Sequence, residues 1–205
     1  MIYLRVKRMM DIIASAMGLV ILSPFLLVLV LAIKLDSTGP VLFKQKRVGL
    51  HKAHFSILKF RTMKIDTPKD TPTHMLESPE QWITRVGKFL RKTSLDELPQ
   101  IINIIKGEMS IIGPRPALWN QYDLIEERDK YGANDVPVGL TGWAQINGRD
   151  ELPIEVKAKL DGEYVQNIGL RMDLRCLFGT IFSIVKSDGV VEGGTGAGVT
   201  KETIK

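Results

Sequence analysis

The sequence predicts an α+β protein with a membrane helix at its N-terminus and a compact, mostly helical catalytic domain that carries a small β-hairpin. Three observations support this fold class: an uncharged apolar segment, two short strand-like segments around a glycine turn, and later segments with helical spacing of apolar residues. We expect residues 1–38 to form the membrane element and residues 39–188 the domain. A glycine-rich flexible tail is expected over 189–205.

The apolar segment from Ile12 to Ile33 contains no charged residue. Its length of about 22 residues gives about 33 Å as a helix, enough to cross a bilayer core. Ser23 and Pro24 lie at its midpoint, where proline removes a backbone donor and disturbs the preceding turn. Basic residues flank both ends, which favours both ends on the cytoplasmic face. We therefore expect a re-entrant helix broken at Ser23-Pro24.

Two other interpretations of this segment remain. One is a single crossing with a proline kink. The other is a signal peptide, but the apolar run is long for that role, and Lys34, Leu35 and Asp36 follow it in place of a small-residue cleavage site.

The rest of the chain alternates short strands, loops and helices. Strands are expected at 41–45 and 53–60, with Gly49 in the turn between them, and a loop at 64–80. The helices at 82–92 and 153–186 mix basic residues with apolar stripes, which suits a membrane surface as well as a protein core. The expected helices cover 82–92, 98–106, 118–131, 153–166 and 172–186.

The composition narrows the function classes. The formal net charge of +5 suits an anionic partner such as nucleic acid, a membrane surface or a phosphorylated substrate. The basic residues are not clustered with exposed aromatics, which argues against nucleic acid. The single cysteine, Cys176, lies in an apolar helical pattern and is expected to be a buried small hydrophobe. The three histidines lack zinc-type spacing with it, so a hard cation such as Mg²⁺ is the metal we expect.

Asp96 and Glu97 are the residues most suited to chemistry. They are adjacent carboxylates ahead of an apolar helical run. An ionised carboxylate needs no base to attack phosphorus and would form an acyl phosphate. The structural alternative is a capping box, with Ser94 as N-cap and Glu97 at the third helical position.

Several basic residues are candidates for binding phosphate, because guanidinium and ammonium groups match phosphate oxygens. Arg115 is the most rigidly presented of them, since Pro114 and Pro116 flank it. The alternative for each is a solvated surface charge. The candidates are Lys59, Arg61, Arg91 and Arg115.

The segment from 139 to 149 combines three glycines, an aromatic residue, amides and an arginine. This composition indicates a tight loop around a ligand, although the glycines also suit ordinary turns and the tryptophan a core. The candidate substrate-binding residues here are Thr141, Trp143, Gln145 and Arg149.

Taken together, these motifs resemble the bacterial sugar transferases known as small monotopic phosphoglycosyl transferases. The resemblance covers residues 5–188 and rests on the basic start with Asp11, the Ser23-Pro24 pair, and three longer motifs. These motifs are KFRTM (59–63), SLDELPQIINIIKGEMSIIGPRP (94–116) and TGWAQINGR (141–149). Many relatives have Arg-Pro-Gly before the last motif, where this chain has Val-Pro-Val-Gly at 136–139.

The resemblance implies a re-entrant helix in the bacterial inner membrane and a catalytic domain on the cytoplasmic face. It implies that Asp96 attacks the β-phosphate of a UDP-sugar and releases UMP. Undecaprenyl phosphate then accepts the phosphosugar, which starts bacterial glycan assembly. It also implies that Mg²⁺ is required, with Asp96 and Glu97 linked to the metal. Membrane lipids are expected partners, and a homodimer remains open. The donor expected from this likeness carries an N-acetylated amino sugar.

Two other function classes remain as alternatives. A membrane-tethered module that only binds anionic lipid or nucleotide would need the basic residues but not an ionised Asp96. A metal-dependent phosphohydrolase would use an aspartyl phosphate but no polyprenyl phosphate.

Overall fold

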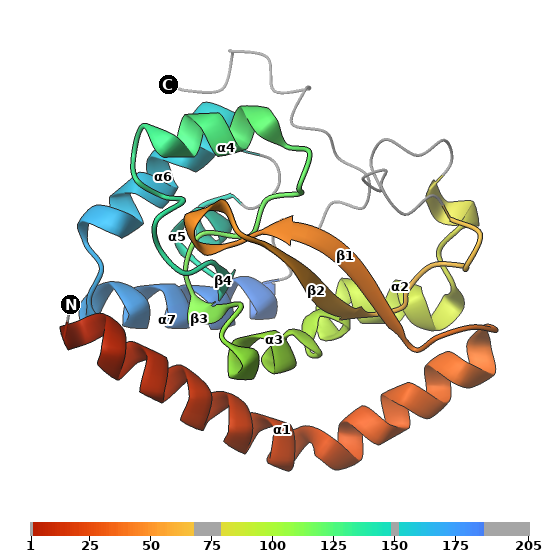
Figure 1. Cartoon of the computed structure of the whole chain (residues 1–205). Helices are drawn as coiled ribbons and strands as arrows, with labels where there is room; N and C mark the ends of the chain where they lie inside the picture. Colours follow the sequence, from red (N-terminus) through yellow and green to blue (C-terminus); the bar gives the residue numbers. More distant parts are fainter. Residues whose placement is uncertain (1, 68–78, 149–151, 187–205) are drawn as a thin grey trace.

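The computed structural model describes residues 2–67, 79–148 and 152–186. Its described part mixes helices and strands, as expected. A long N-terminal helix, α1 (Ile2–Asp36), lies along one side of a domain built around a β-hairpin (Figure 1). The tail expected over 189–205 lies outside the described residues.

The two expected strands form an antiparallel hairpin. Strand β1 (Leu42–Val48) pairs with β2 (His54–Phe60) along its whole length. The first strand runs three residues beyond the expected end, because Val48 still pairs with His54. The connection holds a short 3-10 turn (Leu50–Lys52), in which His51 and Lys52 have positive φ angles of 51° and 60°.

A second, parallel pair of strands was not expected. Strand β3 (Ser110–Ile112) pairs with β4 (Gly139–Thr141), which lies within the segment interpreted as a loop. Both strands have only three residues, too few to show the alternation by which a strand is recognised. The connection between them carries helix α4 (Tyr122–Asp129).

The remaining helices lie close to their expected ranges. The expected helices at 82–92 and 118–131 are shorter in the structure, whereas the last helix starts two residues earlier than expected. The helices are α2 (Arg85–Lys92), α3 (Gln100–Lys106), the short α5 (Trp143–Ile146), α6 (Ile154–Gln166) and α7 (Leu170–Lys186). Cys176 of α7 is fully buried, as expected.

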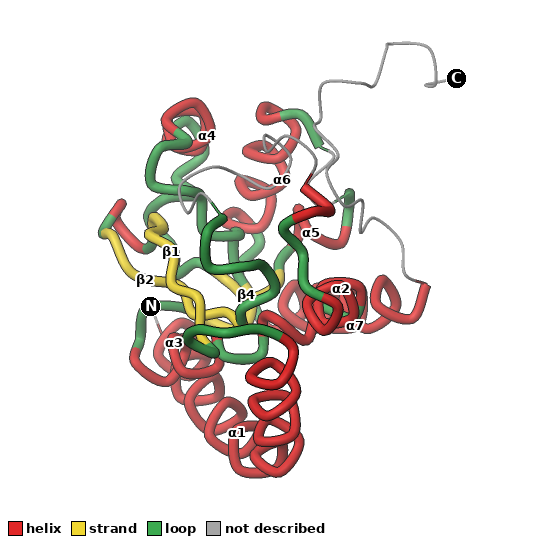
Figure 2. Tube along the Cα trace, turned by 90° about the vertical axis from the view of Figure 1, so that its right-hand side faces the viewer, coloured by secondary structure: helices red, strands yellow, loops and turns green. Residues whose placement is uncertain are grey.

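Helix α1 bends, but it does not break at Ser23-Pro24 as the sequence suggested. It is helical from Ile2 to Asp36 with Pro24 inside it. Proline removes one backbone hydrogen bond, and the turns on either side continue around it. The result is two limbs that meet at an angle at the bottom of Figure 1 and diverge from there, and Figure 2 shows the same bent helix below the domain.

Helix α1 is long and apolar enough to cross a membrane, and only 11% of its most apolar 18-residue window is buried inside the protein. A core helix of a soluble protein would be mostly buried. The exposed side chains include Val20 and Ile21, which are 73% and 70% exposed. Such a surface is stable only against another apolar medium.

The first limb of α1 is anchored by buried polar contacts. The Lys7 ammonium lies 2.8 Å from the Asp173 carboxylate of α7, and the Tyr3 hydroxyl donates to the same carboxylate at 2.7 Å. Asp11 accepts a hydrogen bond from the Ser110 hydroxyl of β3 at 2.7 Å. Arg8 donates to the carbonyl of Ile104 near the end of α3. This limb is therefore fixed to α3, β3 and α7.

The second limb is anchored mainly by apolar packing. Leu29 and Ile33 are buried against Phe60 of β2 and Leu90 of α2. At the end of the limb, the Asp36 carboxylate accepts a hydrogen bond from the backbone N–H of Val86 at 3.0 Å. Both ends of α1 thus meet the same domain.

The other side of the domain is held by a buried ion pair. Arg128 of α4 donates two hydrogen bonds to Oδ2 of Asp161 on α6, at 2.8 and 2.6 Å. The two residues are 2% and 0% exposed. Burial raises the pKa of Asp161, against the opposing charge of Arg128.

Replacing Arg128 by methionine is expected to lower the free energy of unfolding by about 3–5 kcal/mol, because it leaves the Asp161 charge buried without its partner. Denaturant unfolding of the detergent-solubilised protein measures the loss. Lys130→Met, which removes an exposed pair with Glu127, is the control and should leave the midpoint unchanged. An equal effect of the two substitutions would contradict this account.

Candidate active site

Asp96 and Glu97 lie on a 3-10 turn, η4 (Leu95–Glu97), between α2 and α3. Ser94 precedes the turn with a φ of 56°, a left-handed conformation that serine rarely adopts. Its side chain makes no capping hydrogen bond, so the capping box considered from the sequence is not formed. Strained backbone of this kind is frequent at functional sites.

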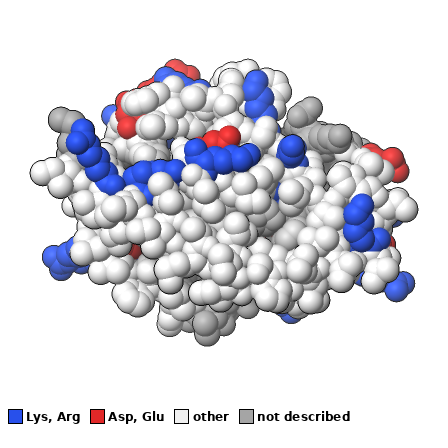
Figure 3. Space-filling model, turned by 60° about the horizontal axis from the view of Figure 1, so that its bottom comes forward, with Lys and Arg blue, Asp and Glu red and all other residues white. Residues whose placement is uncertain are grey.

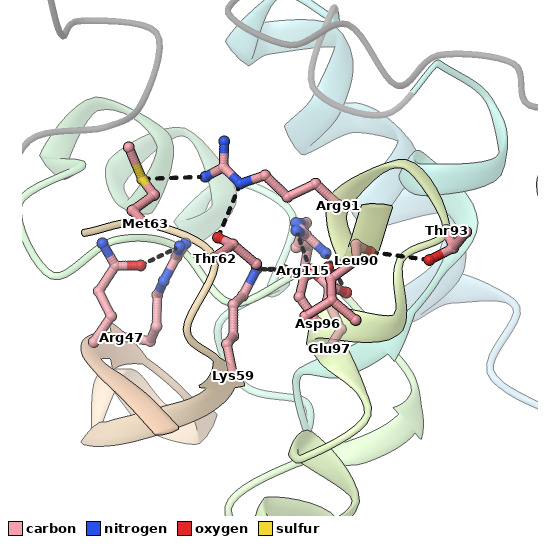
Figure 4. A network of polar contacts seen from close by, with 11 residues as sticks. Arg47, Lys59, Thr62, Met63, Leu90, Arg91, Thr93, Asp96, Glu97 and Arg115 are labelled. Atoms are coloured by element: carbon pink, nitrogen blue, oxygen red, sulfur yellow. Dashed lines mark hydrogen bonds and ion pairs between the residues drawn. The ribbon is translucent and has the colours of Figure 1, made fainter. Parts of the chain in front are cut away.

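Glu97 is clamped between two cations. Its Oε1 accepts hydrogen bonds from the Lys59 ammonium at 2.7 Å and from the Arg115 guanidinium at 2.8 Å. A second Arg115 nitrogen lies 3.4 Å from Oε2 (Figure 4). Burial alone would raise the pKa of Glu97, but the charges and hydrogen bonds of Arg115 and Lys59 outweigh it and hold the pKa well below its usual range. Glu97 is therefore an anion with a structural task.

Asp96 is held differently. Its carboxylate lies 3.9 Å from the Lys59 ammonium, beyond hydrogen-bond distance, and the residue is 9% exposed. Burial raises the pKa of Asp96 above its ordinary value, and the negative charge of Glu97 adds to this, although Lys59 opposes it. The two neighbouring carboxylates are thus driven in opposite directions, an arrangement typical of acid pairs with different roles.

Arg91 completes the cationic surroundings of Asp96. It lies in the last turn of α2, where its Nε donates to the Thr62 hydroxyl at 3.1 Å and a terminal nitrogen lies 3.6 Å from the Met63 sulfur. Its positive charge lowers the pKa of Asp96. Figure 4 shows Lys59 and Arg115 extending toward the carboxylate pair from two segments of the chain, whereas the Arg91 guanidinium points toward Thr62 and Met63.

The backbone that presents Arg115 depends on glycines. The N–H of Gly113 donates to the Thr141 carbonyl at 2.9 Å, and the N–H of Gly139 donates to the Pro114 carbonyl at 2.8 Å. A Cβ atom on Gly142 would lie 2.1 Å from the Gly113 carbonyl oxygen. The glycines of this segment therefore permit close backbone contact between the ends of β3 and β4.

The structure places three of the other candidates in contacts away from the carboxylate pair. Arg61 donates to the carbonyls of Ser37 and Pro40 just after α1. The Thr141 hydroxyl bonds that of Thr180 on α7 at 2.6 Å. The Trp143 indole N–H donates to Glu163 of α6 at 3.0 Å.

Two candidates in the 141–149 motif have other outcomes. Both polar atoms of the Gln145 amide are buried and have no hydrogen-bond partner among the described residues. Arg149 lies outside the described residues. Arg47 was not among the site residues predicted from the sequence, but its side chain lies beside the cluster in Figure 4. The alternation of side chains along the two hairpin strands could have indicated that Arg47 shares a face with Lys59.

The carboxylate pair could supply two of the oxygen ligands of a hard cation. Among the described residues, no group of three or more His, Cys, Asp or Glu side chains could hold a metal ion. Mg²⁺, however, is commonly held by one or two carboxylates together with substrate phosphates. Asp96 and Glu97 supply oxygen donors of that kind.

The family of this chain is shown by its similarity to known proteins. The family model described as bacterial sugar transferase matches residues 2–187. The chain belongs to the bacterial sugar transferase family. The resemblance inferred from the motifs is confirmed, and so is the expectation that this chain is a transferase.

Three relatives illustrate the range of this family. The chain is 39% identical to "Uncharacterized sugar transferase EpsL" of Bacillus subtilis, over 90% of this chain and 89% of the relative. It is 40% identical to "UDP-glucose:undecaprenyl-phosphate glucose-1-phosphate transferase" of Escherichia coli, over 86% of this chain but 39% of the relative. It is 36% identical to "UDP-N-acetylgalactosamine-undecaprenyl-phosphate N-acetylgalactosaminephosphotransferase" of Aeromonas hydrophila, over 92% and 45%. The sugar transferase thus spans less than half the length of the Escherichia coli and Aeromonas hydrophila relatives.

Gly142→Ala is expected to destabilise the transferase by about 1–3 kcal/mol, because the added methyl group collides with the Gly113 backbone. It should also lower activity, since Gly113 leads directly to Arg115. Thermal unfolding and turnover test both effects. Gly169→Ala is the control, since the nearest atom to its Cβ would be 3.8 Å away. A Gly142→Ala protein with unchanged stability and activity would contradict the proposed backbone contact.

Proposed function

We propose that this sugar transferase moves a phosphosugar from a UDP-sugar to undecaprenyl phosphate by way of a covalent intermediate on Asp96. The observation that carries the proposal is the asymmetry of the carboxylate pair. Glu97 is hydrogen-bonded by Lys59 and Arg115, whereas the buried Asp96 carboxylate lies 3.9 Å from the Lys59 ammonium, beyond hydrogen-bond distance. That is the placement expected of a nucleophile whose target arrives as a phosphate.

In the first step, a carboxylate oxygen of Asp96 attacks the β-phosphorus of the donor. The bond from this phosphorus to the bridging oxygen of the α-phosphate breaks, and UMP leaves with that oxygen. The phosphosugar remains on Asp96 as an acyl phosphate. Lys59, Arg91 and Arg115 are placed to offset the charge on the phosphate oxygens.

In the second step, a phosphate oxygen of undecaprenyl phosphate attacks the same phosphorus. The bond to the Asp96 carboxylate breaks, which regenerates the free enzyme and gives undecaprenyl diphosphate-sugar. The order of events is ping-pong, because UMP leaves before the acceptor reacts. A buried Asp96 also helps to keep water from hydrolysing the intermediate.

Asp96 and Glu97 are the residues that would hold Mg²⁺. When bound, the ion would neutralise part of the charge on the diphosphate of the donor. Both carboxylate oxygens of Glu97 accept hydrogen bonds from Arg115, and Oε1 also accepts one from Lys59. Glu97 therefore fixes these two cations at the site without the metal.

The membrane position that we propose is re-entrant, with both ends of α1 and the catalytic domain on the cytoplasmic face of the inner membrane. Support comes from the contacts of α1, because both of its limbs are fixed to one domain. In Figure 3 the face that carries α1 is broad and nearly free of charged side chains, and lysines and arginines gather along its edge. An apolar face with a basic edge suits an anionic lipid surface.

The donor that we propose carries an N-acetylated amino sugar. The names of two relatives include UDP-glucose and UDP-N-acetylgalactosamine, so both belong in a donor panel. The product would enter the assembly of a bacterial surface glycan, and "Exopolysaccharide production protein ExoY" of Rhizobium meliloti is a further relative, at 36% identity.

Asp96→Asn is expected to lower UMP release by at least about 1,000-fold, because the amide is not a nucleophile. The assay follows UMP from a panel of UDP-sugars with Mg²⁺, with and without undecaprenyl phosphate. Asp135→Asn, which changes an exposed carboxylate bonded to His51, is the control and should be fully active. A variant Asp96→Asn that binds donor and still releases UMP at the wild-type rate would refute the assignment.

Cysteines introduced at Ile2 and Lys44, near the two ends of α1, are expected to lie on the same, cytoplasmic face of the membrane. In a Cys176→Ala background, a membrane-impermeant thiol reagent should label neither position in intact cells and both after lysis. Labelling of only one position from outside would mean that α1 crosses the membrane.

A further inference from the structure

Arg47 is a cation beside the active site to which the proposed reaction assigns no task. Arg47 lies on β1. The residue of β1 directly opposite Lys59 of β2 is Phe43, which therefore lies on the same face of the hairpin as Lys59. Because side chains alternate along a strand, residues 43, 45 and 47 share the hairpin face of Lys59. Figure 4 shows the Arg47 and Lys59 side chains extending from the hairpin toward the same region.

The guanidinium of Arg47 makes two hydrogen bonds that fix its position. One terminal nitrogen donates to the Pro116 carbonyl at 3.0 Å, and the other donates to Oε1 of Gln45 at 2.7 Å. The backbone supports this contact, since the N–H of Val48 donates to the Ala117 carbonyl at 2.9 Å. The segment after Arg115 therefore runs beside the end of β1.

Arg115 needs such support because of its neighbours. Pro114 and Pro116 have no N–H group, so the chain around Arg115 offers mainly carbonyl oxygens as anchor points. The carbonyl before Arg115, from Pro114, accepts the N–H of Gly139. The carbonyl after it, from Pro116, accepts the guanidinium of Arg47. The carbonyls of the two prolines on either side of Arg115 thus each accept a hydrogen bond.

We propose that Arg47 is a positioning residue that fixes the backbone at Pro116 and thereby aims the Arg115 guanidinium at Glu97 and at the phosphate of the donor. This inference rests on the proposed transferase reaction. A displacement of about 1 Å at a group that stabilises the transition state can cost up to about 100-fold in rate. Arg47 therefore acts on the reaction through Arg115.

A double-mutant cycle tests this dependence. Single-turnover UMP release from UDP-glucose and UDP-N-acetylgalactosamine is measured for wild type, Arg47→Met, Arg115→Met and the double variant. Arg47→Met is expected to lower the rate about 10-fold in the wild-type background and less than about 2-fold when Arg115 is already absent. Lys44→Met, on the same strand but the other face of the hairpin, is the control and should match wild type.

Equal falls in both backgrounds, or no fall in either, would overturn the proposal. If Arg47→Met does not fold, as judged by its thermal unfolding, the cycle is run with Arg47→Lys, which keeps the charge but loses the two-pronged donor, under the same criteria. A wild type that released no UMP from either donor or from the wider panel of UDP-sugars would overturn the proposed reaction on Asp96, together with the role of Arg47. Additive losses in an active enzyme would overturn the role of Arg47 alone.

Discussion

The ionic clamp on Glu97 is the interaction on which the rest of the site depends. Lys59 comes from the hairpin, Arg115 from the segment after β3, and Glu97 from the turn between α2 and α3. One buried carboxylate thus ties three distant parts of the chain together. Lys59 is hydrogen-bonded to Glu97 and lies 3.9 Å from the Asp96 carboxylate, beyond hydrogen-bond distance. The geometry separates a structural acid from a reactive one.

The second limb of α1 packs against residues next to the cations of the site. The second limb packs on Phe60, one residue after Lys59, and on Leu90, one residue before Arg91. Its last residue, Asp36, accepts a hydrogen bond from the start of α2. The membrane element therefore supports two of the three cations near Asp96. In the proposed reaction the acceptor is a lipid, and the same helix would then position both the bilayer and the active site.

Much of this could be predicted from local sequence. The apolar length of 12–33, the alternation in the hairpin strands and the adjacent carboxylates are all short-range signals, and the structure contains the corresponding elements. The parallel pair β3 and β4 could not be predicted, because it joins two three-residue segments whose contact depends on glycine backbones far apart in sequence. The break expected at Pro24 was wrong because flanking turns kept the helix continuous.

The candidate site shows the same limit. Lys59, Arg91 and Arg115 were found by residue type and do surround Asp96 and Glu97, whereas Arg61 instead holds the carbonyls after α1. Charge alone cannot distinguish these cases, since the partner of each arginine is set by tertiary packing. Arg47 was overlooked for the same reason, because its contact with Pro116 spans 69 positions of the sequence.

The most direct test of the central claim is to locate the phosphosugar on the enzyme. Wild type is incubated with a UDP-sugar and Mg²⁺ without undecaprenyl phosphate, quenched, and analysed by intact-mass and peptide-mapping mass spectrometry. We expect one phosphosugar adduct on Asp96, which is lost on addition of undecaprenyl phosphate and is absent from Asp96→Asn. An adduct on Glu97, or full turnover through a direct transfer with no adduct, would contradict the central claim.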